Sequence, residues 1–138
     1  MVMDNALQLF QIWEKQLISC KPISWTNLKE IPRINGVYMI CHIGYPNIVY
    51  IGESKDIFDR IWKHHRTGNC SAFRSNLQKY YSVNKNQPLD VQIQQFLDEC
   101  VVKYVELPYG RKEFEEYLIT KYNPKYNRQG TIKCKNKV

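Results

Sequence analysis

The chain contains GVYMICHI at residues 36–43 and IVYIGE at residues 48–53, and these two segments set the fold to be expected. Both are rich in β-branched and aromatic residues, which favour strands. The sequence GYPN at residues 44–47 between them is typical of a turn. We therefore expect an antiparallel hairpin that carries one tyrosine on each strand, Tyr38 and Tyr50.

The register of this hairpin determines whether the two tyrosines share a face. With Ile43 opposite Ile48, the two rings point to opposite faces, because side chains alternate along a strand. With Ile43 opposite Asn47, or with a bulge, both rings point to the same face. The sequence leaves both arrangements open, and only the second allows the two rings to share a site.

Helical periodicity, capping residues and a further apolar segment place the remaining elements. VVKYVEL at residues 101–107 has the composition of a third strand. The order of elements indicates an α+β fold, in which a small, largely antiparallel three-stranded β-sheet is flanked by helices, with an added N-terminal helix. Helices are expected at about residues 4–19, 24–30, 54–66, 71–80, 91–100 and 111–122, with Ser24, Ser54 and Ser71 as N-caps.

The composition excludes several classes of protein. With 138 residues, 43% of them apolar and 13% aromatic, the chain suffices for one compact domain with its own core. No apolar run approaches the roughly 18 residues that span a bilayer, and the first residues lack the basic segment of a secretion signal. Five cysteines without a CxxC pair favour reduced thiols over a disulfide framework or a zinc site. We expect a soluble, cytoplasmic protein that does not bind membranes.

Charge is distributed unevenly along the chain. The net charge is +7, from 20 Lys and Arg against 13 Asp and Glu. Residues 121–138 hold six basic residues and no acidic one. Such a segment favours a polyanion such as nucleic acid, although many basic tails are only solvated chain ends. The charge alone therefore leaves the partner open.

One acidic residue breaks the pattern of the last helix. At about 100° per residue, Phe114 and Leu118 begin an apolar stripe, and Glu115 lies within that stripe. Its neighbours Glu113 and Glu116 lie on the polar side. A carboxylate on a core-facing stripe needs a partner, because burying an unpaired charge is costly. Glu115 is therefore either half of a buried ion pair or a metal-binding or catalytic acid.

The helix after the hairpin carries two polar side chains at the edge of its buried stripe. Arg60 and His64 are four residues apart and would lie one helical turn from each other. In the simplest interpretation, Arg60 pairs with Asp56, and His64 is a half-buried histidine without a chemical role. His65 falls within the apolar stripe and is expected in the core.

Taken together, these residues resemble the GIY-YIG nuclease family, over about residues 31–127. The elements that carry the resemblance are Gly36-Val37-Tyr38, Tyr50-Ile51-Gly52, Arg60, His64, Glu115 and Pro124-Lys125-Tyr126-Asn127, the last being similar to the family's PxYN sequence. Val37 in place of isoleucine is a conservative departure. Glu53 departs further, because many members carry a basic residue directly after YIG.

The resemblance implies a nuclease domain at residues 31–128, with a helical extension at 1–30 and a basic tail at 129–138. It implies hydrolysis of DNA phosphodiester bonds in one step by an activated water, with one divalent cation, Mg²⁺ or Mn²⁺. One alternative is an inactive module on the same scaffold that only binds nucleic acid. Another is a structural domain in which Glu115 and Arg60 form a buried ion pair. A homodimer or a partner protein that supplies specificity is compatible with each.

The resemblance also assigns chemical roles. The general base would be Tyr38, Tyr50 or His64, and the sequence does not choose among the three. Arg60 would stabilise the negative charge of the pentacoordinate phosphorane. Glu115 would hold the metal ion through its carboxylate.

Contacts to the nucleic-acid backbone are assigned in the same way. Asn127 would position the phosphate or the metal environment through its amide. Lys55 or Lys63 would replace the basic residue that is missing at Glu53. The basic residues expected to bind the nucleic-acid backbone are Lys55, Lys63, Arg66, Lys125 and Arg128.

Overall fold

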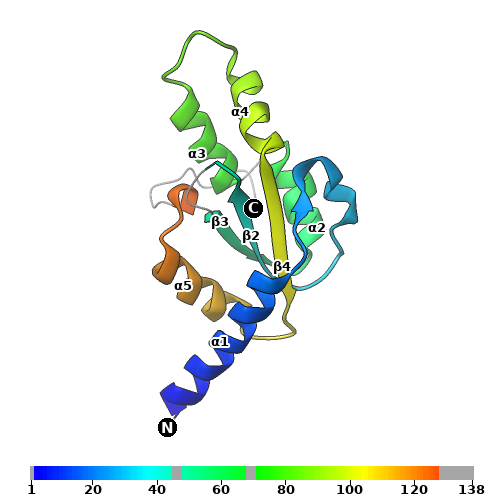
Figure 1. Cartoon of the computed structure of the whole chain (residues 1–138), viewed down its shortest axis with the longest axis vertical. Helices are drawn as coiled ribbons and strands as arrows, with labels where there is room; N and C mark the ends of the chain where they lie inside the picture. The colour runs from blue at the N-terminus through cyan, green and yellow to red at the C-terminus, as the bar shows by residue number, and fades with distance from the viewer. Residues whose placement is uncertain (1, 45–47, 68–70, 128–138) are drawn as a thin grey trace, which may run out of the picture.

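The computed structural model describes residues 2–44, 48–67 and 71–127 of the chain. A single sheet lies between helices that cover both of its faces (Figure 1). No helix in this described part is both long and apolar enough to cross a lipid bilayer. The elements follow in the order α1 (Val2–Ser19), β1 (Ile23–Ser24), η1 (Trp25–Glu30), β2 (Gly36–His42), β3 (Ile48–Ser54), α2 (Ile57–Asp59), η2 (Arg60–His65), α3 (Ala72–Tyr81), α4 (Leu89–Asp98), β4 (Cys100–Glu106), α5 (Arg111–Tyr122) and η3 (Lys125–Asn127).

The sheet has four antiparallel strands in the order β1-β4-β2-β3. The α+β class and the three longer strands agree with the sequence prediction. The fourth strand, β1, corrects the expected number of three, since Ile23 pairs with Val102 and Ser24 with Val101. Two residues provide too little alternation for a strand to be recognised in sequence. Because β3 ends the strand order, it is an edge strand.

The hairpin of β2 and β3 has the arrangement in which the two tyrosines share a face. Tyr38 pairs with Gly52. Two positions further along β2, Ile40 pairs with Tyr50, so both rings point to the same side of the sheet. The register then shifts between Ile40 and Cys41, which is a bulge close to the turn.

Each face of the sheet has its own apolar cluster. The first face packs against α1 and α5, and the second packs against η1, α3 and α4, in agreement with the layers seen in Figure 1. The two tyrosines belong to the second face. Buried residues of the first cluster include Leu17, Val37, Met39, Ile51, Phe114 and Leu118; those of the second include Trp25, Tyr38, Tyr50, Ile61, Phe73 and Leu97.

The helix after β3 differs from the sequence prediction in its cap and its winding. Asp56, and not Ser54, is the N-cap, since its Oδ1 accepts a backbone N–H of the first turn at 3.0 Å. The α-helical part ends after one turn, and η2 continues it as a π-helix. This helix is closed by a 2.9 Å hydrogen bond from the Arg66 N–H to the Ile61 carbonyl oxygen. A π-turn holds more residues than an α-turn, so the α-helical phase no longer predicts where each side chain points.

Helix α1 is fastened to α5 by a buried carboxylate. Glu14 is 6% exposed, and it accepts hydrogen bonds from Lys121 Nζ at 2.8 Å, from the Tyr117 hydroxyl at 3.0 Å and from the Tyr122 hydroxyl. Burial acts to raise the pKa of Glu14, but these hydrogen bonds outweigh it and hold the pKa below its ordinary value. The carboxylate therefore stays charged and joins the N-terminal helix to the helix that carries Glu115.

Candidate active site

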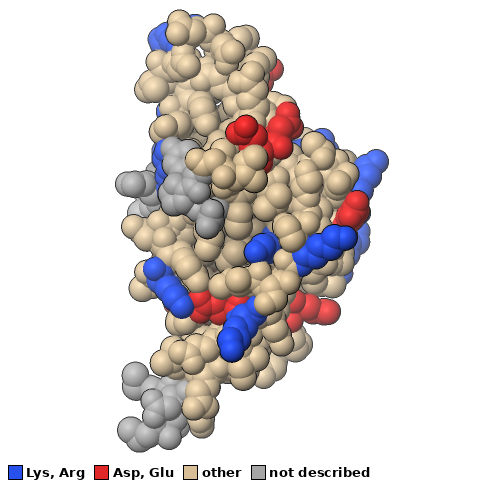
Figure 2. Space-filling view, viewed as in Figure 1, with Lys and Arg blue, Asp and Glu red and all other residues tan. Residues whose placement is uncertain are grey.

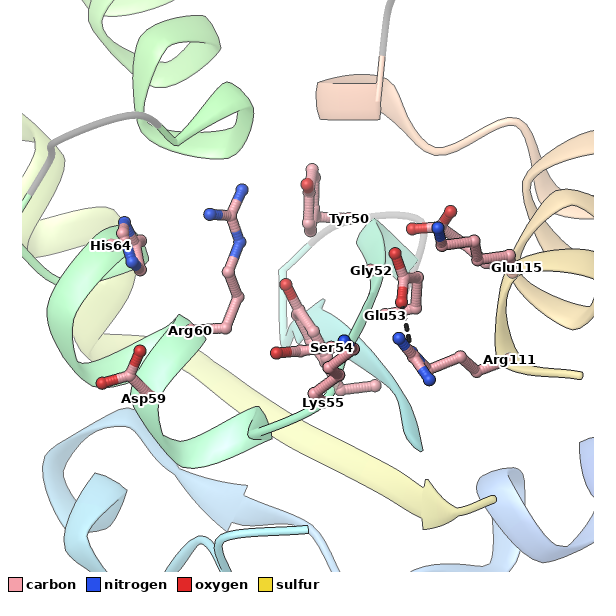
Figure 3. Close-up of a pocket in the computed structure, with 12 residues that line it drawn as sticks. Tyr50, Gly52, Glu53, Ser54, Lys55, Asp59, Arg60, His64, Arg111 and Glu115 are labelled. Atoms are coloured by element: carbon pink, nitrogen blue, oxygen red, sulfur yellow. Dashed lines mark hydrogen bonds and ion pairs between the residues drawn. The ribbon is translucent and has the colours of Figure 1, made fainter. Parts of the chain in front are cut away.

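A cavity of about 430 Å³ lies at the β3 edge of the sheet, between η2 and α5 (Figure 3). Arg60 and His64 lie on one side of it and Glu115 on the other, with Tyr50 between them. Residues from both faces meet here because the sheet ends at β3. The cavity is lined by Tyr38, Tyr50, Gly52, Glu53, Ser54, Lys55, Asp59, Arg60, His64, Arg111, Lys112 and Glu115.

Two buried tyrosines form the floor of the cavity. Their ring centroids are 6.3 Å apart. Burial, followed by the neighbouring Tyr50, raises the pKa of Tyr38 well above its ordinary value, and burial raises the pKa of Tyr50 to about 12. Both hydroxyl groups are therefore protonated near neutral pH.

Arg60 faces both tyrosines from η2. Its positive charge lies close enough to both hydroxyl groups to offset part of the effect of burial on their pKa values. Asp56, the partner considered from sequence, pairs instead with Arg33, at 2.7 Å between Oδ2 and Nη1. Within the described residues Arg60 forms no ion pair, so its charge is directed to the cavity. His64 also lines the cavity.

Glu115 reaches the cavity from α5. Burial, followed by the charges of Glu53 and Glu116, raises the pKa of Glu115 to about 7. The Arg60 charge and the nearby backbone of Glu53 oppose this rise only in part. Over the described ranges Glu115 forms no ion pair, and a buried pair with Arg60 is therefore not present. A half-buried carboxylate without a counter-ion is suited to bind a cation.

Glu53 and Arg111 form an ion pair on the cavity wall, drawn as a dashed line in Figure 3. Arg111 Nε donates to Glu53 Oε1 at 2.6 Å, and Arg111 Nη1 donates to Asn35 Oδ1 at 3.0 Å. The Arg111 side chain is 17% exposed and the Glu53 side chain is 22% exposed. From sequence, Glu53 is only a departure from the resembled pattern. Arg111 gives no signal at all, because its partner is distant in the chain.

Asn127 lies against the outer edge of β3 and not in the cavity lining. Its Oδ1 accepts the Ile51 N–H at 2.8 Å, and its Nδ2 donates to the Ile51 carbonyl oxygen at 2.8 Å. The amide therefore pairs with the edge strand as a further strand would. This differs from the sequence prediction, in which the amide contacts phosphate or metal. Both of its polar groups are already used in holding the strand between Tyr50 and Gly52.

The residues predicted to bind nucleic acid lie in different places. Lys55 lines the cavity. Lys63 is exposed and pairs with Asp59 at 3.1 Å. Lys112 also lines the cavity, although the sequence does not single it out. Lysines at the rim can contact a bound polyanion without being held in one geometry.

Two other predicted residues stack on aromatic rings away from the cavity lining. The Arg66 guanidinium lies 3.8 Å from the centroid of the Trp62 ring, and Lys125 Nζ lies 3.6 Å from that of Tyr80. Arg128 lies outside the described residues. Figure 2 shows basic and acidic side chains interspersed on the face it presents. On that face, the charge does not gather into one broad basic surface.

The family can be assigned from the sequence of this same region. A family model of the GIY-YIG catalytic domain matches residues 34–127, which include both tyrosines, Arg60 and Glu115. The chain belongs to the GIY-YIG family. The match begins just before β2 and ends at Asn127, so it contains every residue that lines the cavity.

Solved structures with detectable similarity include the N-terminal GIY-YIG endonuclease domain of UvrC from Thermotoga maritima. The form of that domain bound to magnesium is 26% identical, with 75% of this chain and 93% of that chain covered and a TM-score of 0.42. A point mutant bound to its catalytic divalent cation is 24% identical over the same shares, with a TM-score of 0.44. No curated protein matches the chain.

Proposed function

We propose that this GIY-YIG protein is a divalent-metal-dependent endonuclease that hydrolyses phosphodiester bonds of DNA by one-step attack of an activated water. One observation carries the proposal. A single cavity places the Arg60 guanidinium and two tyrosine hydroxyl groups opposite the half-buried carboxylate of Glu115. Such a cavity offers a proton acceptor, a fixed positive charge and a cation ligand to one phosphate.

The side chains of the cavity fit a hydrated magnesium-type ion better than a tightly held metal. The described residues contain no group of three or more His, Cys, Asp or Glu side chains placed to hold an ion. Mg²⁺ accepts one or two carboxylates and completes its shell with waters and phosphate oxygens. Glu115 would hold Mg²⁺ or Mn²⁺, and the ion would supply Lewis-acid stabilisation of the leaving oxygen. Glu53, which is close enough to raise the Glu115 pKa, adds negative charge beside it.

The remaining chemistry belongs to the side chains. Tyr38, Tyr50 and His64 all line the cavity and are within the set that can take a proton from water. Arg60, always charged and directed to the cavity, would stabilise the negative charge that develops on the phosphate oxygens. Its charge acts on both tyrosine hydroxyl groups, so it would also favour the ionised form of either one during proton transfer.

Substrate affinity would come from the cations around the cavity. Lys55, Arg111 and Lys112 line it, and the basic segment at residues 121–138 adds positive charge close to the end of the domain. Contacts of this kind are to the phosphate backbone, so they bind DNA without reading its sequence. We assign Asn127 a positioning role, in which its amide holds β3 and with it Tyr50.

The domain boundaries and the setting are part of the same proposal. We place the nuclease domain at residues 31–128, preceded by a helical extension and followed by a basic tail. We expect reduced cysteines and a cytoplasmic location, since Cys20, Cys41 and Cys100 are free thiols in the described residues. One cavity cuts one strand, so cutting both strands would require a homodimer, two successive cuts or a partner protein.

Cleavage assays test the proposal directly. Supercoiled plasmid and labelled single-stranded, duplex and branched DNA are incubated with Mg²⁺, Mn²⁺ or EDTA, with wild type and Glu115→Gln compared. We expect metal-dependent cutting by the wild type and a loss of at least about a hundredfold in the variant, with DNA binding retained. DNA binding without cutting on any substrate would favour the inactive binding module.

A further inference from the structure

His65 is a fully buried histidine with both ring nitrogens engaged. It is 0% exposed and does not line the cavity. Its Nε2 lies 2.5 Å from the Tyr38 hydroxyl oxygen, and its Nδ1 lies 2.6 Å from Ser71 Oγ. Ser71 is the N-cap of α3 and also accepts the Arg74 N–H at 3.0 Å. A continuous chain of hydrogen bonds therefore runs from the cavity floor to the start of α3.

The π-helical winding of η2 places this histidine. Arg60 and His64 line the cavity, while His65 turns behind the cavity wall toward Tyr38. In a regular α-helix each residue advances by about 100°, which would carry His65 further from the side of Arg60. The wider turn reduces that advance, so one helix supplies both the cavity residues and a partner for the tyrosine beneath them.

The two tyrosines differ in what can receive their protons. Arg60 lies near both, but arginine only donates hydrogen bonds and accepts no proton. For the Tyr50 hydroxyl, the described residues provide no hydrogen-bond acceptor. Tyr38 has the imidazole of His65, which accepts at one nitrogen when it is neutral.

The surroundings of His65 keep it neutral. Burial, followed by the charges of Arg60 and His64, lowers its pKa well below the ordinary value. The rings of Tyr38, Tyr50 and Phe73 lie against it at centroid distances of 5.6, 5.1 and 5.5 Å. A neutral imidazole has one donor and one acceptor nitrogen, so the chain of hydrogen bonds has a single direction at any moment.

We propose that His65 is a positioning residue for Tyr38. Its Nε2 accepts a hydrogen bond from the Tyr38 hydroxyl, and its Nδ1–H donates to Ser71 Oγ. Of the two tyrosines, Tyr38 is then the one that takes the proton of the attacking water. The proposal rests on the nuclease function above. As the water oxygen bonds to phosphorus and the bond to the leaving oxygen breaks, the water proton passes to Tyr38 Oη while the Tyr38 proton passes to Nε2. After product release this proton returns through Tyr38 to solvent, and the leaving oxygen is protonated by water.

A measurement without DNA or metal tests the hydrogen-bond direction. Side-chain ¹⁵N NMR of the wild type distinguishes a protonated Nδ1 from a protonated Nε2 and reports any titration of the ring. We expect His65 to be the neutral Nδ1–H form at neutral pH, with any titration of the ring lying below that of an ordinary histidine. A neutral Nε2–H form, or an imidazolium near neutral pH, would overturn the proposal whether or not the protein cleaves DNA. The Nδ1–H form in a protein that cleaves nothing would contradict the nuclease function itself.

Variants of the two partners test the effect on turnover. Ser71→Ala removes the hydroxyl that holds Nδ1, whereas Ser71→Thr keeps a hydroxyl there. We expect Ser71→Ala to lower kcat about tenfold at unchanged KM and to shift the pH profile of kcat, with Ser71→Thr close to wild type. Unchanged kcat and an unchanged pH profile in a folded Ser71→Ala protein would overturn the proposal.

Replacement of the histidine itself gives a second comparison. His65→Gln keeps a hydrogen-bond acceptor that orients the Tyr38 hydroxyl, although its amide cannot take up the proton, and His65→Leu keeps neither property. At equal folded fractions, measured by circular dichroism, we expect His65→Gln to cleave at least about tenfold faster than His65→Leu. Equal rates for the two folded variants would contradict the positioning role. If neither folds, the Ser71 pair and the NMR measurement decide the question.

Discussion

The ring of Tyr38 lies directly over Gly52, its partner across the β2–β3 hairpin. A Cβ at Gly52 would overlap both the ring and the hydroxyl group of Tyr38, closer than side-chain atoms approach. The glycine of YIG therefore allows the tyrosine of GIY to lie flat against the neighbouring strand, with its hydroxyl at the cavity. The GIY and YIG motifs are therefore linked by packing, because the tyrosine of the first lies against the glycine of the second.

We predict that Gly52→Ala displaces Tyr38 and lowers the cleavage rate at least about a hundredfold, since small misplacements of a reacting group cost this much. The rate is measured from a time course of DNA cleavage at saturating Mg²⁺, with samples quenched at intervals. Gly44→Ala is the matched control, because the nearest atom to its Cβ is a His42 ring carbon at 3.3 Å, which a small shift accommodates. Near wild-type cleavage by folded Gly52→Ala would contradict this packing role.

Glu115→Gln should make the metal-free protein more stable at neutral pH. Burial raises the pKa of Glu115 from 4.5 to about 7, so the folded protein binds this proton more tightly than the unfolded chain. The free energy of unfolding of the wild type therefore falls as pH rises between these values, by about 1.4 kcal/mol per pKa unit. Urea unfolding at pH 5 and pH 8 should show this fall, and the glutamine variant should lose it. A loss of 3–5 kcal/mol in Glu115→Ala, roughly the usual cost of breaking a buried ion pair, would instead indicate a structural role.

Glu53→Gln should shift the pH dependence of cleavage to lower pH. The Glu53 charge is the second cause of the raised Glu115 pKa, after burial, so its removal lets Glu115 ionise more readily. The acidic limb of the pH profile of kcat/KM would shift to lower pH, and Mg²⁺ would bind at lower pH. Arg33→Gln is a suitable control, because it breaks an exposed ion pair with Asp56 that is outside the cavity. An unshifted profile would show that Glu53 does not influence the carboxylate.

Glu14→Ala should lower stability by about 2 kcal/mol at pH 7, since hydrogen bonds to a charged group contribute roughly 1.5–3 kcal/mol. The pKa of Glu14 is below its ordinary value, so this contribution is present above the unfolded pKa and is lost as pH falls through the folded one. The difference between wild type and variant, measured by urea unfolding, should therefore shrink in acid. Lys15→Ala on the same helix is the control. A difference that stays constant down to about pH 3 would argue against a charged Glu14.

Asn127→Ala should destabilise the edge strand. The variant leaves the N–H and carbonyl groups of Ile51 without their side-chain partner, which costs about 1–3 kcal/mol if water does not replace it. Hydrogen exchange at the Ile51 amide should accelerate, and cleavage should fall because Tyr50 is the neighbouring residue. Asn127→Asp keeps only the acceptor and should restore protection of the Ile51 amide in part. Unchanged exchange with a strong loss of activity would point to direct contact of Asn127 with substrate.

The sequence motifs predicted which residues line the cavity, because each motif can be recognised from a few consecutive residues. The strands β2, β3 and β4 follow from their β-branched and aromatic composition. The limits of α5 and the placement of Glu115 within its apolar stripe follow from capping signals and helical periodicity. The resemblance to the GIY-YIG pattern added Tyr38, Tyr50 and Arg60, which the structure brings into one cavity.

Other features could not be derived in this way. The strand β1 is too short to show a pattern, and the N-cap of α2 is Asp56 because its carboxylate, and not the Ser54 hydroxyl, reaches the first turn. The sequence prediction assumed regular α-helical winding, whereas η2 is a π-helix. The prediction therefore placed His65 in the core but did not show its contact with Tyr38.

The sequence by itself determined the family, the α+β class and the chemical types that line the site, since these depend on residue identity and local spacing. Only the tertiary structure decided the hairpin register that puts two tyrosines on one face, the Glu53–Arg111 pair and the pairing of Asn127 with Ile51. These contacts join residues that are far apart in the chain. Their energies depend on burial and distance, which exist only once the sheet edge, η2 and α5 have packed together.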